Sequence, residues 1–252
     1  MKMTLLEMVV DILSDSGSDV INSISDTEEA QQVAQILKST YYEMMAKKNW
    51  PHLRKLTQLD TLSDPTLPNV MQVPAETKEI VSIAYDAIKL NDTKSDMATV
   101  YYLPPDEFLA QVNTRDSSKD EIDTITINDG AKLLIYNDRA ATCWTSFDEF
   151  NIIFDSYNSD VDVFMLNEKS QVILFKTGDV WLSDDSFTPN LPAEFFPALL
   201  AEAKSIAFYV LKQELNEKAE QQSKRQQVAM ATKGNVVGID TSYEGFGRKG
   251  RL

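Results

Sequence analysis

The fold is decided near the end of the chain, where residues 191–235 read LPAEFFPALLAEAKSIAFYVLKQELNEKAEQQSKRQQVAMATKGN. The first half of this stretch repeats apolar residues at spacings of three and four, which is typical of a helix buried along one face. These residues are Leu199, Leu200, Ala203, Ile206, Ala207, Val210 and Leu211. After Leu215 nothing large and apolar recurs until Val228, although the residues between them are good helix formers. We therefore predict a buried helix that continues as a polar extension, which suits contact with another protein.

The start of the chain predicts two more helices. Thr4 and Glu7 have the spacing of a capping box, and an apolar stripe follows them. The N-terminus of a second helix is indicated at Ser25 or Asp26. This helix of about twenty residues then runs to the Asn-Trp-Pro sequence at 49–51. These helices cannot bury their stripes alone, so they must pack against something else.

The middle of the chain changes to short, strand-like runs separated by turn residues. Asn128-Asp129-Gly130 is a good hairpin turn, and Pro104-Pro105-Asp106 is a suitable start for a short helix. Residues 147–154 fit either a strand or a loop. The strand-like runs are Ile80–Tyr85, Thr99–Leu103, Ile122–Ile127, Lys132–Tyr136 and Val172–Lys176.

We predict an α+β fold: an antiparallel helical bundle built from the N- and C-terminal helices, with an inserted β-rich domain. The reason is that the helices of both chain ends have to bury their apolar stripes together. The expected divisions are residues 1–56 for the N-terminal helices, 57–190 for the β-rich domain, 191–233 for the C-terminal helix and 234–252 for an extended tail.

The charge of the chain is strongly negative and unevenly placed. The net charge is −15, but residues 221–252 carry +4, so the first 220 residues carry −19. An acidic body opposes tight binding to nucleic acid, because that affinity comes largely from neutralising phosphates. No apolar run approaches the ~20 residues that span a bilayer. Glu7 and Asp11 interrupt the apolar stretch that a secretory signal would need, so we do not expect secretion.

Groups for catalysis or metal binding are few. Cys143 is the only cysteine and His52 the only histidine, which excludes disulfides and metal sites built on several such residues. We interpret His52 as a packing residue. Two carboxylates placed across a cleft would suit a glycan hydrolase, but with 39 acidic residues close pairs arise by chance. The candidates are Asp148, Glu149, Asp155, Asp160, Asp162, Asp184 and Asp185. We predict no enzyme activity, no cofactor and no metal.

Aromatic residues gather in one part of the predicted β-rich domain. They are Trp144, Phe147, Phe150, Phe154 and Tyr157. Stacking on a sugar or a nucleobase is one interpretation, and the core of the domain is the other and preferred one.

The tail mixes isolated aromatic residues with positive charge. A terminus without a role is one interpretation of residues 240–251. We prefer an extended segment that orders on a partner, with Tyr243 and Phe246 as anchors and the arginines as contacts for carboxylates.

Three segments together resemble the head-to-tail adaptor proteins of short-tailed phages, the tail tubular protein A-like family. They are Glu7–Leu13, the helix Glu28–Lys48 with Asn49-Trp50 after it, and Leu199–Phe208 running into Asn216–Arg225. The chain departs from the family pattern in the turn at residues 14–20 and in a longer tail.

The resemblance implies a structural virion protein that forms a ring, usually of twelve copies. Such a ring joins the portal protein to a tail or nozzle protein and encloses the channel through which DNA passes without specific binding. The protein would be made in the host cytoplasm and reside at the capsid–tail junction, with no membrane contact. Candidate portal contacts are Lys224, Arg225, Tyr243, Phe246, Arg248, Lys249 and Arg251. The alternatives are another neck or tail ring protein, or a carboxylate-based glycan hydrolase.

Overall fold

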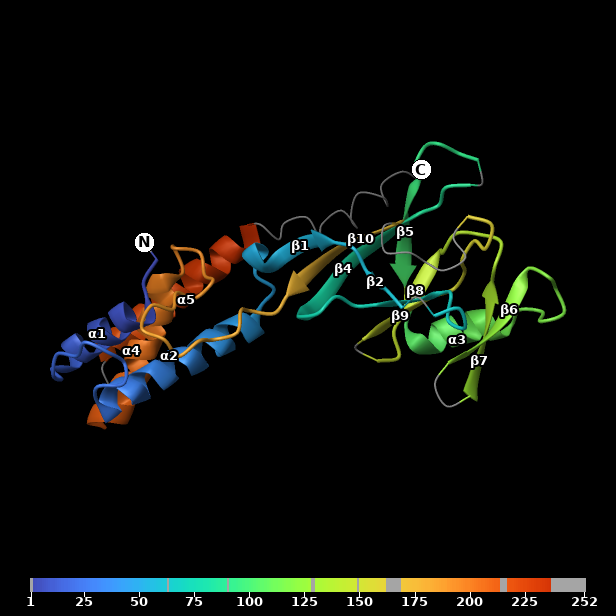
Figure 1. Cartoon of the computed structure of the whole chain (residues 1–252). Coiled ribbons are helices and arrows are strands. Elements are labelled where there is room, and N and C mark those ends of the chain that lie inside the picture. Colours follow the sequence, from blue (N-terminus) through green and yellow to red (C-terminus); the bar gives the residue numbers. More distant parts are fainter. Residues whose placement is uncertain are drawn as a thin grey trace. The chain divides into compact units, whose positions relative to one another are not determined.

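A computed structural model describes residues 2–62, 64–89, 91–127, 130–148, 150–161, 169–213 and 217–236. The fold is α+β, with helices near both ends of the chain and strands between them (Figure 1). The chain divides into two compact units. The helical unit contains Met1–Leu53 and Thr177–Leu252, and the β unit contains Arg54–Lys176.

Caps set the start of both N-terminal helices. The capping box predicted for α1 (Leu5–Ser16) is confirmed, because the Glu7 N–H donates to the Thr4 hydroxyl at 3.2 Å and the Thr4 N–H donates to the Glu7 carboxylate at 2.8 Å. Helix α2 (Glu28–Lys47) begins after Thr27, whose hydroxyl accepts the Ala30 N–H at 3.1 Å. The predicted cap at Ser25 or Asp26 is wrong, since the Asp26 carboxylate instead accepts the N–H groups of residues 22 and 23.

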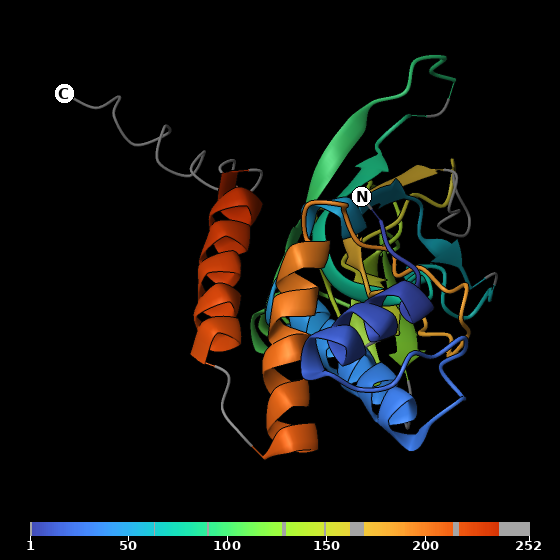
Figure 2. The same ribbon diagram turned by 90° about the vertical axis from the view of Figure 1, so that its left-hand side faces the viewer.

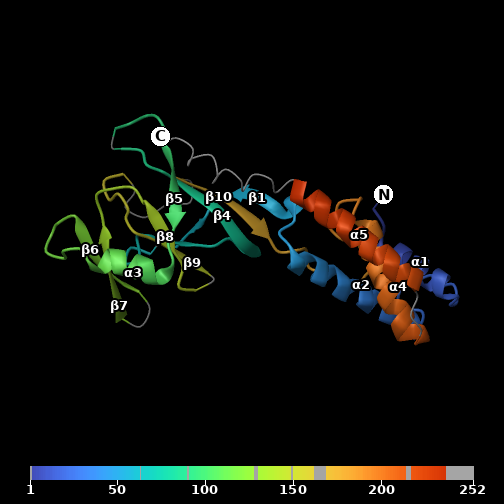
Figure 3. The same cartoon turned by 180° about the vertical axis from the view of Figure 1, so that it is seen from behind.

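The C-terminal region forms two helices instead of one continuous helix. Helix α4 (Phe196–Lys212) ends at Gln213, whose φ of 54° places it in the left-handed region. Helix α5 (Glu217–Val236) then starts separately. Figures 2 and 3 show α5 running beside α4, which corrects the prediction of a single helix to residue 233. The prediction failed because glutamine gives no signal for a left-handed helix end.

The core of the helical unit lies where α1, α2 and α4 pack on one another. One ion-pair cluster joins α1 to α4: the Lys204 ammonium lies 2.9 Å from Asp11 and 2.5 Å from Asp15. The buried side chains include Leu5, Met8, Val9, Ile12, Val33, Leu37, Tyr41, Leu199, Ala203 and Ala207. Since these come from both ends of the sequence, neither end can bury its apolar face without the other.

The segment before α4 also belongs to the helical unit. The Leu5 N–H donates to the Phe187 carbonyl at 2.7 Å, and the Trp181 ring lies 5.4 Å from the Tyr41 ring. Gly178 is held so close to α2 that a Cβ atom there would lie 3.0 Å from Met45. Residues 177–190 thus pack with the helices, although the sequence pattern placed them in the β-rich domain.

The β unit is built on an eight-stranded sheet and a separate hairpin. The sheet order is β1-β10-β4-β5-β8-β9-β3-β2. Among the described ladders of this sheet, β5 and β8 pair in parallel and the other neighbours pair antiparallel. The hairpin consists of β6 (Ile122–Ile127) and β7 (Ala131–Tyr136). The sheet strands are β1 (Arg54–Thr57), β2 (Asp60–Thr61), β3 (Val70–Gln72), β4 (Thr77–Asp86), β5 (Met97–Tyr102), β8 (Cys143–Thr145), β9 (Asn151–Phe154) and β10 (Ser170–Lys176).

The five predicted strand runs all correspond to strands, namely β4, β5, β6, β7 and β10. Gly130, with a φ of 94°, ends the predicted hairpin turn, while its Asn128 and Asp129 lie outside the described residues. The ambiguous stretch 147–154 is a turn followed by β9. The predicted short helix is α3 (Pro105–Asn113), which buries Phe108 and Val112 in the core of the β unit. The 3-10 turn η1 (Pro51–Leu53) follows α2 and is the last element of the N-terminal segment of the helical unit.

An ion pair is buried inside the β unit. Arg115 follows α3, and its guanidinium lies 3.3 Å from the Asp155 carboxylate, with only 6% and 4% of the two side chains exposed. The same guanidinium donates to the carbonyls of Leu134 at 3.0 Å and Asp155 at 2.6 Å. It also stacks over the Tyr136 ring, 4.2 Å from its centroid. One side chain thereby joins α3, the hairpin and the end of β9.

Candidate functional site

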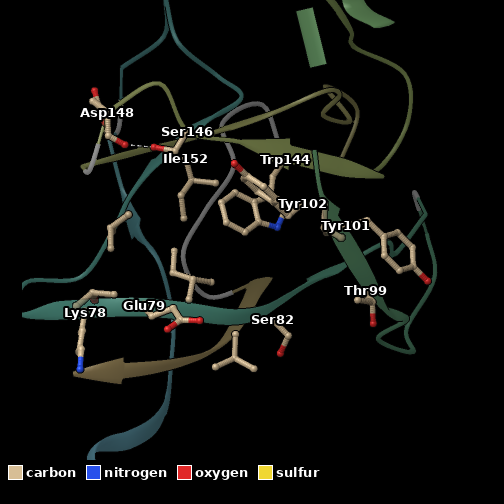
Figure 4. Close-up of a pocket in the computed structure, with 15 residues that line it drawn as sticks. Lys78, Glu79, Ser82, Thr99, Tyr101, Tyr102, Trp144, Ser146, Asp148 and Ile152 are labelled. Carbon is tan, nitrogen blue, oxygen red and sulfur yellow. Dashed lines mark hydrogen bonds between the residues drawn. The ribbon is translucent and has the colours of Figure 1, made fainter. Parts of the chain in front are cut away.

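A hollow of about 650 Å³ opens along β4, β5, β8 and β9 of the β unit. Figure 4 shows its aromatic wall, where the Tyr102 ring lies 4.9 Å from the Trp144 ring in an edge-on arrangement. Its polar lining includes Thr77, Lys78, Glu79, Ser82, Thr99, Ser146 and Asp148. A hollow of this size and lining can hold a small ligand or part of a protein partner.

Two carboxylates face this hollow, as the glycan-hydrolase alternative requires. Figure 4 shows Glu79 on β4 and Asp148 on the opposite wall. Burial raises the pKa of the Asp148 carboxyl, but hydrogen bonds from Asn151 and Phe150 outweigh it and hold the pKa below the usual value. Asp148 is therefore ionised at neutral pH and unsuited to act as a general acid.

Three of the other candidate carboxylates form structural bonds. Asp155 forms the buried pair with Arg115, the Asp184 carboxylate accepts the Ser186 N–H at 2.8 Å, and Asp185 accepts the Ile24 N–H at 2.8 Å. Asp160 lies on an exposed turn, and Glu149 and Asp162 lie outside the described residues. Within the described residues no cluster of three or more histidine, cysteine or acidic side chains suits a metal ion.

His52 and Cys143 have different surroundings. His52 lies in η1 of the helical unit, half-buried. Cys143 is buried in β8, where burial and the negative charge of Asp155 raise the pKa of its thiol to about 12. The thiol stays protonated at neutral pH and is a poor nucleophile.

The aromatic patch divides into core and surface residues. Trp144, Phe154 and Tyr157 are buried in the β unit, as the core interpretation predicts. That interpretation is wrong for Phe147, which is 45% exposed, and for Phe150, which is 72% exposed. The two exposed phenylalanines lie in the turn between β8 and β9, where the chain leaves the sheet and cannot direct them into the core.

Hydrogen bonds hold this β8–β9 turn. One Asp148 carboxylate oxygen accepts the N–H groups of Phe150 at 2.8 Å and Asn151 at 2.6 Å, while the other accepts the Asn151 side-chain amide at 2.9 Å. The Ser146 hydroxyl bonds the carbonyls of Asp148 and Asn151 (Figure 4 draws Ser146 beside Asp148). The Val73 N–H on the neighbouring chain segment donates to the Phe150 carbonyl at 2.8 Å. The spacing of serine, aspartate and asparagine is a turn signal, and it would have located this feature from the sequence.

The contact between α4 and α5 in the helical unit is mainly polar. One oxygen of the Glu202 carboxylate on α4 accepts the Ser223 hydroxyl and, at 2.7 Å, the Gln227 amide, both from α5. Ser223 is buried, which the polar sequence of this helix does not predict. Beside this contact lies a largely apolar cavity of about 210 Å³, which we call the socket. It is lined by Thr40, Glu43, Met44, Lys47, Lys48, Trp50, Ala198, Glu202 and Gln227.

Of the predicted portal contacts, Lys224 and Arg225 are exposed on α5. Lys224 bonds Glu220, one turn earlier, at 2.6 Å. The other five lie outside the described residues: Tyr243, Phe246, Arg248, Lys249 and Arg251.

None of the described helices has the length and apolar character needed to cross a membrane. No protein-family profile and no curated protein sequence matches the chain. Among solved structures, one similar chain comes from the neck of an empty GTA particle, computed with C6 symmetry. The two chains are 8% identical over 90% of this chain and 93% of that one, with a TM-score of 0.25. A TM-score this low does not establish a shared fold.

Proposed function

We propose that this protein is a structural virion component, the head-to-tail adaptor that joins a phage portal to the tail. The observation that carries the proposal is the arrangement of the chain: helices from both ends pack into one unit, and Arg54–Lys176 forms a second. This arrangement agrees with the three segments that resemble the tail tubular protein A-like family. We further interpret the helical unit as an antiparallel bundle that builds the ring, with twelve copies expected.

The charge of the chain supports a channel through which DNA passes. The first 220 residues carry −19, and like charge repels phosphate over roughly a Debye length, about 8–10 Å at ordinary salt. We expect the purified protein not to shift duplex DNA in a gel at moderate salt. A sub-micromolar affinity for DNA would contradict this role.

Negative-stain microscopy of the purified chain, alone and mixed with the portal protein from the same genome, tests the proposal. We expect rings on the portal and weakly associated or monomeric protein without it. A chain that stays monomeric and ignores the portal would refute the adaptor role. Rings that bind only a tail component would favour a different neck or tail ring protein.

The portal contact is proposed to lie on α5 and the tail that follows it. Reversing two adjacent charges on α5, Lys224→Glu with Arg225→Glu, should weaken portal binding. The matched control is Arg54→Glu with Lys55→Glu, an adjacent basic pair on β1 that is also exposed. Deletion of residues 234–252 should abolish portal binding in a protein that still folds. Equal binding by all variants would remove this surface from the proposal.

Catalysis is not part of the proposal. The glycan-hydrolase alternative rests on Glu79 and Asp148, which both line the hollow of the β unit. Clearing of a peptidoglycan suspension by the wild type, lost in Glu79→Gln, would support that alternative and overturn a purely structural role.

A further inference from the structure

The hollow of the β unit contains a buried polar group that lacks a protein acceptor. Trp144 is only 9% exposed, and Figure 4 shows its indole nitrogen turned toward the hollow. Among the residues that the structure describes, no acceptor bonds this N–H group. A buried donor without an acceptor costs free energy, which a ligand oxygen placed in the hollow would recover.

An open aromatic face lies beside this N–H group. Tyr102 packs edge-on against Trp144, with the ring centres 4.9 Å apart, and remains 54% exposed. Its backbone is fixed, because Tyr102 pairs with Trp144 between β5 and β8 and the Leu103 N–H donates to the Trp144 carbonyl at 2.9 Å. The face of an aromatic ring is weakly negative, whereas the C–H groups on one side of a sugar ring are weakly positive. Tyr102 is therefore a suitable surface on which a sugar ring stacks.

The polar lining is rich in groups that bond hydroxyls. Ser82 on β4 and Thr99 on β5 carry hydroxyls that both donate and accept. The Asp148 carboxylate is ionised at neutral pH and only accepts. A sugar carries several O–H groups, each of which donates one hydrogen bond and accepts others. It therefore satisfies the acceptors of the lining and the single indole donor together.

The charge of the hollow restricts the sugar to a neutral one. The described lining contains two carboxylates and one lysine. Residues 54–176 contain 21 acidic and 11 basic side chains, a net charge of −10. Such surroundings repel phosphate and carboxylate groups over about 8–10 Å at ordinary salt, which disfavours nucleotides and acidic polysaccharides. Anchors of protein partners fill well-packed apolar pockets, whereas polar side chains lie on both walls of this hollow.

We propose that the hollow binds a neutral glycan built of hexose units. Tyr102 stacks on one sugar ring, and the Trp144 N–H donates to an oxygen of the same glycan. Ser82, Thr99 and Asp148 bond its hydroxyls. In a virion, this site would hold the β unit to a cell-surface polysaccharide. That consequence rests on the proposed function, whereas the binding itself does not.

Nuclear magnetic resonance of the purified chain tests the site without portal protein. Labelling with nitrogen-15 tryptophan gives three indole signals, and the signal missing from Trp144→Phe belongs to Trp144. We expect at least one of maltohexaose, cellohexaose and mannohexaose to shift this signal, and the acidic hexagalacturonate to leave it unchanged. The Trp50 signal is an internal control, because its N–H already donates to the Met44 carbonyl at 2.8 Å. Cleavage of the bound sugar would replace the inference with the glycan-hydrolase alternative.

Two variants measure what the aromatic residues contribute to binding. Tyr102→Thr removes the stacking ring from an exposed strand position and should weaken binding at least about tenfold. Trp144→Phe keeps a ring but removes the N–H group, and should weaken binding about fivefold, the effect of one hydrogen bond. The control is Tyr209→Thr, which removes a ring that is 61% exposed on α4 of the helical unit. Circular dichroism shows whether each variant folds, and Tyr102→Thr decides alone if Trp144→Phe does not.

The outcomes separate this site from the adaptor role. Equal binding by wild type and Tyr102→Thr would overturn the inference, as would a Trp144 signal that none of the three neutral sugars shifts. A Trp144 signal that shifts with portal protein and with no sugar would assign the hollow to a protein partner and overturn it as well. A sugar-binding chain that forms no rings on the portal would refute the adaptor role and leave the glycan site in place.

Discussion

The buried ion pair of Arg115 and Asp155 makes a sharp prediction about the stability of the β unit. Changing Arg115 to methionine keeps a long side chain but leaves the Asp155 carboxylate without its countercharge. Removing one partner of a buried pair costs about 3–5 kcal/mol. Asp155 keeps bonds from the N–H groups of Thr142 at 2.8 Å and Cys143 at 3.0 Å, so we expect the lower end, about 3 kcal/mol.

The loss is measurable by thermal and urea unfolding followed by circular dichroism. Unfolding entropies near 2.1 cal/mol/K per residue give about 4 °C for each kcal/mol in a unit the size of Arg54–Lys176. The midpoint of that unit should therefore fall by about 12 °C. In urea the midpoint should fall while the slope of the transition stays unchanged.

Arg139→Met is a closely matched control. Arg139 also stacks on the Tyr136 ring, at 3.9 Å, but its ion pair with Asp138 is exposed and should contribute less than about 1 kcal/mol. Adding Asp155→Asn to Arg115→Met should recover part of the loss, because it removes the uncompensated charge. If Arg115→Met cost no more than Arg139→Met, or the double variant were less stable still, the account of the buried pair would be refuted.

Three further changes test the helical unit. Thr27→Ala removes the cap of α2 and should lower the free energy of unfolding by about 1 kcal/mol, whereas Thr27→Ser should not; equal losses in a urea titration would show that the cap bond contributes nothing. Lys204→Met removes the ion pairs between α4 and α1, and should lower the free energy of unfolding by only about 0.5–1 kcal/mol because the two carboxylates are half-exposed. This loss should shrink in 1 M salt if it is electrostatic. Burial and the charge of Asp179 raise the pKa of Tyr41 to about 12, while an unfolded tyrosine ionises near pH 10. The folded state thus holds this proton where the unfolded state loses it, so stability is complete below pH 10 and falls as pH rises toward 12; Tyr41→Phe should flatten this decline, and an identical pH curve would contradict the assignment.

The sequence predicted the elements with strong periodicity and missed those fixed by distant contacts. The capping box of α1 and the apolar stripes of α2 and α4 are local patterns, so they could be recognised directly. The strands β1, β2, β3 and β8 were missed because they have only two to four residues, too few to establish alternation. The boundary after β10 was missed because residues 177–190 carry no helical or strand signal and are positioned by packing on α1 and α2.

The candidate surfaces could be predicted in part. The cluster of aromatic residues around Trp144 is visible in the sequence. The alternation of apolar residues could not distinguish the buried Phe154 from the exposed Phe150, because a turn interrupts it. The polar character of α5 was predicted correctly. Its contact with α4 was not, because Gln227 bonds Glu202, which lies more than twenty positions earlier in the sequence. Long-range polar pairs of this kind leave no periodic trace in a single sequence.

A helical core shared by both chain ends also determines the order of events on the ribosome. Helix α2 is complete at Lys47, but the helix it packs against ends at Lys212, about 165 residues later. At translation rates of roughly 5–20 residues per second the apolar faces of α1 and α2 wait on the order of 10–30 s for α4. The contiguous β unit can fold within that interval. Newly made chains are thus exposed to association through their N-terminal helices until α4 has been synthesised, which makes slow translation or early termination a source of aggregation.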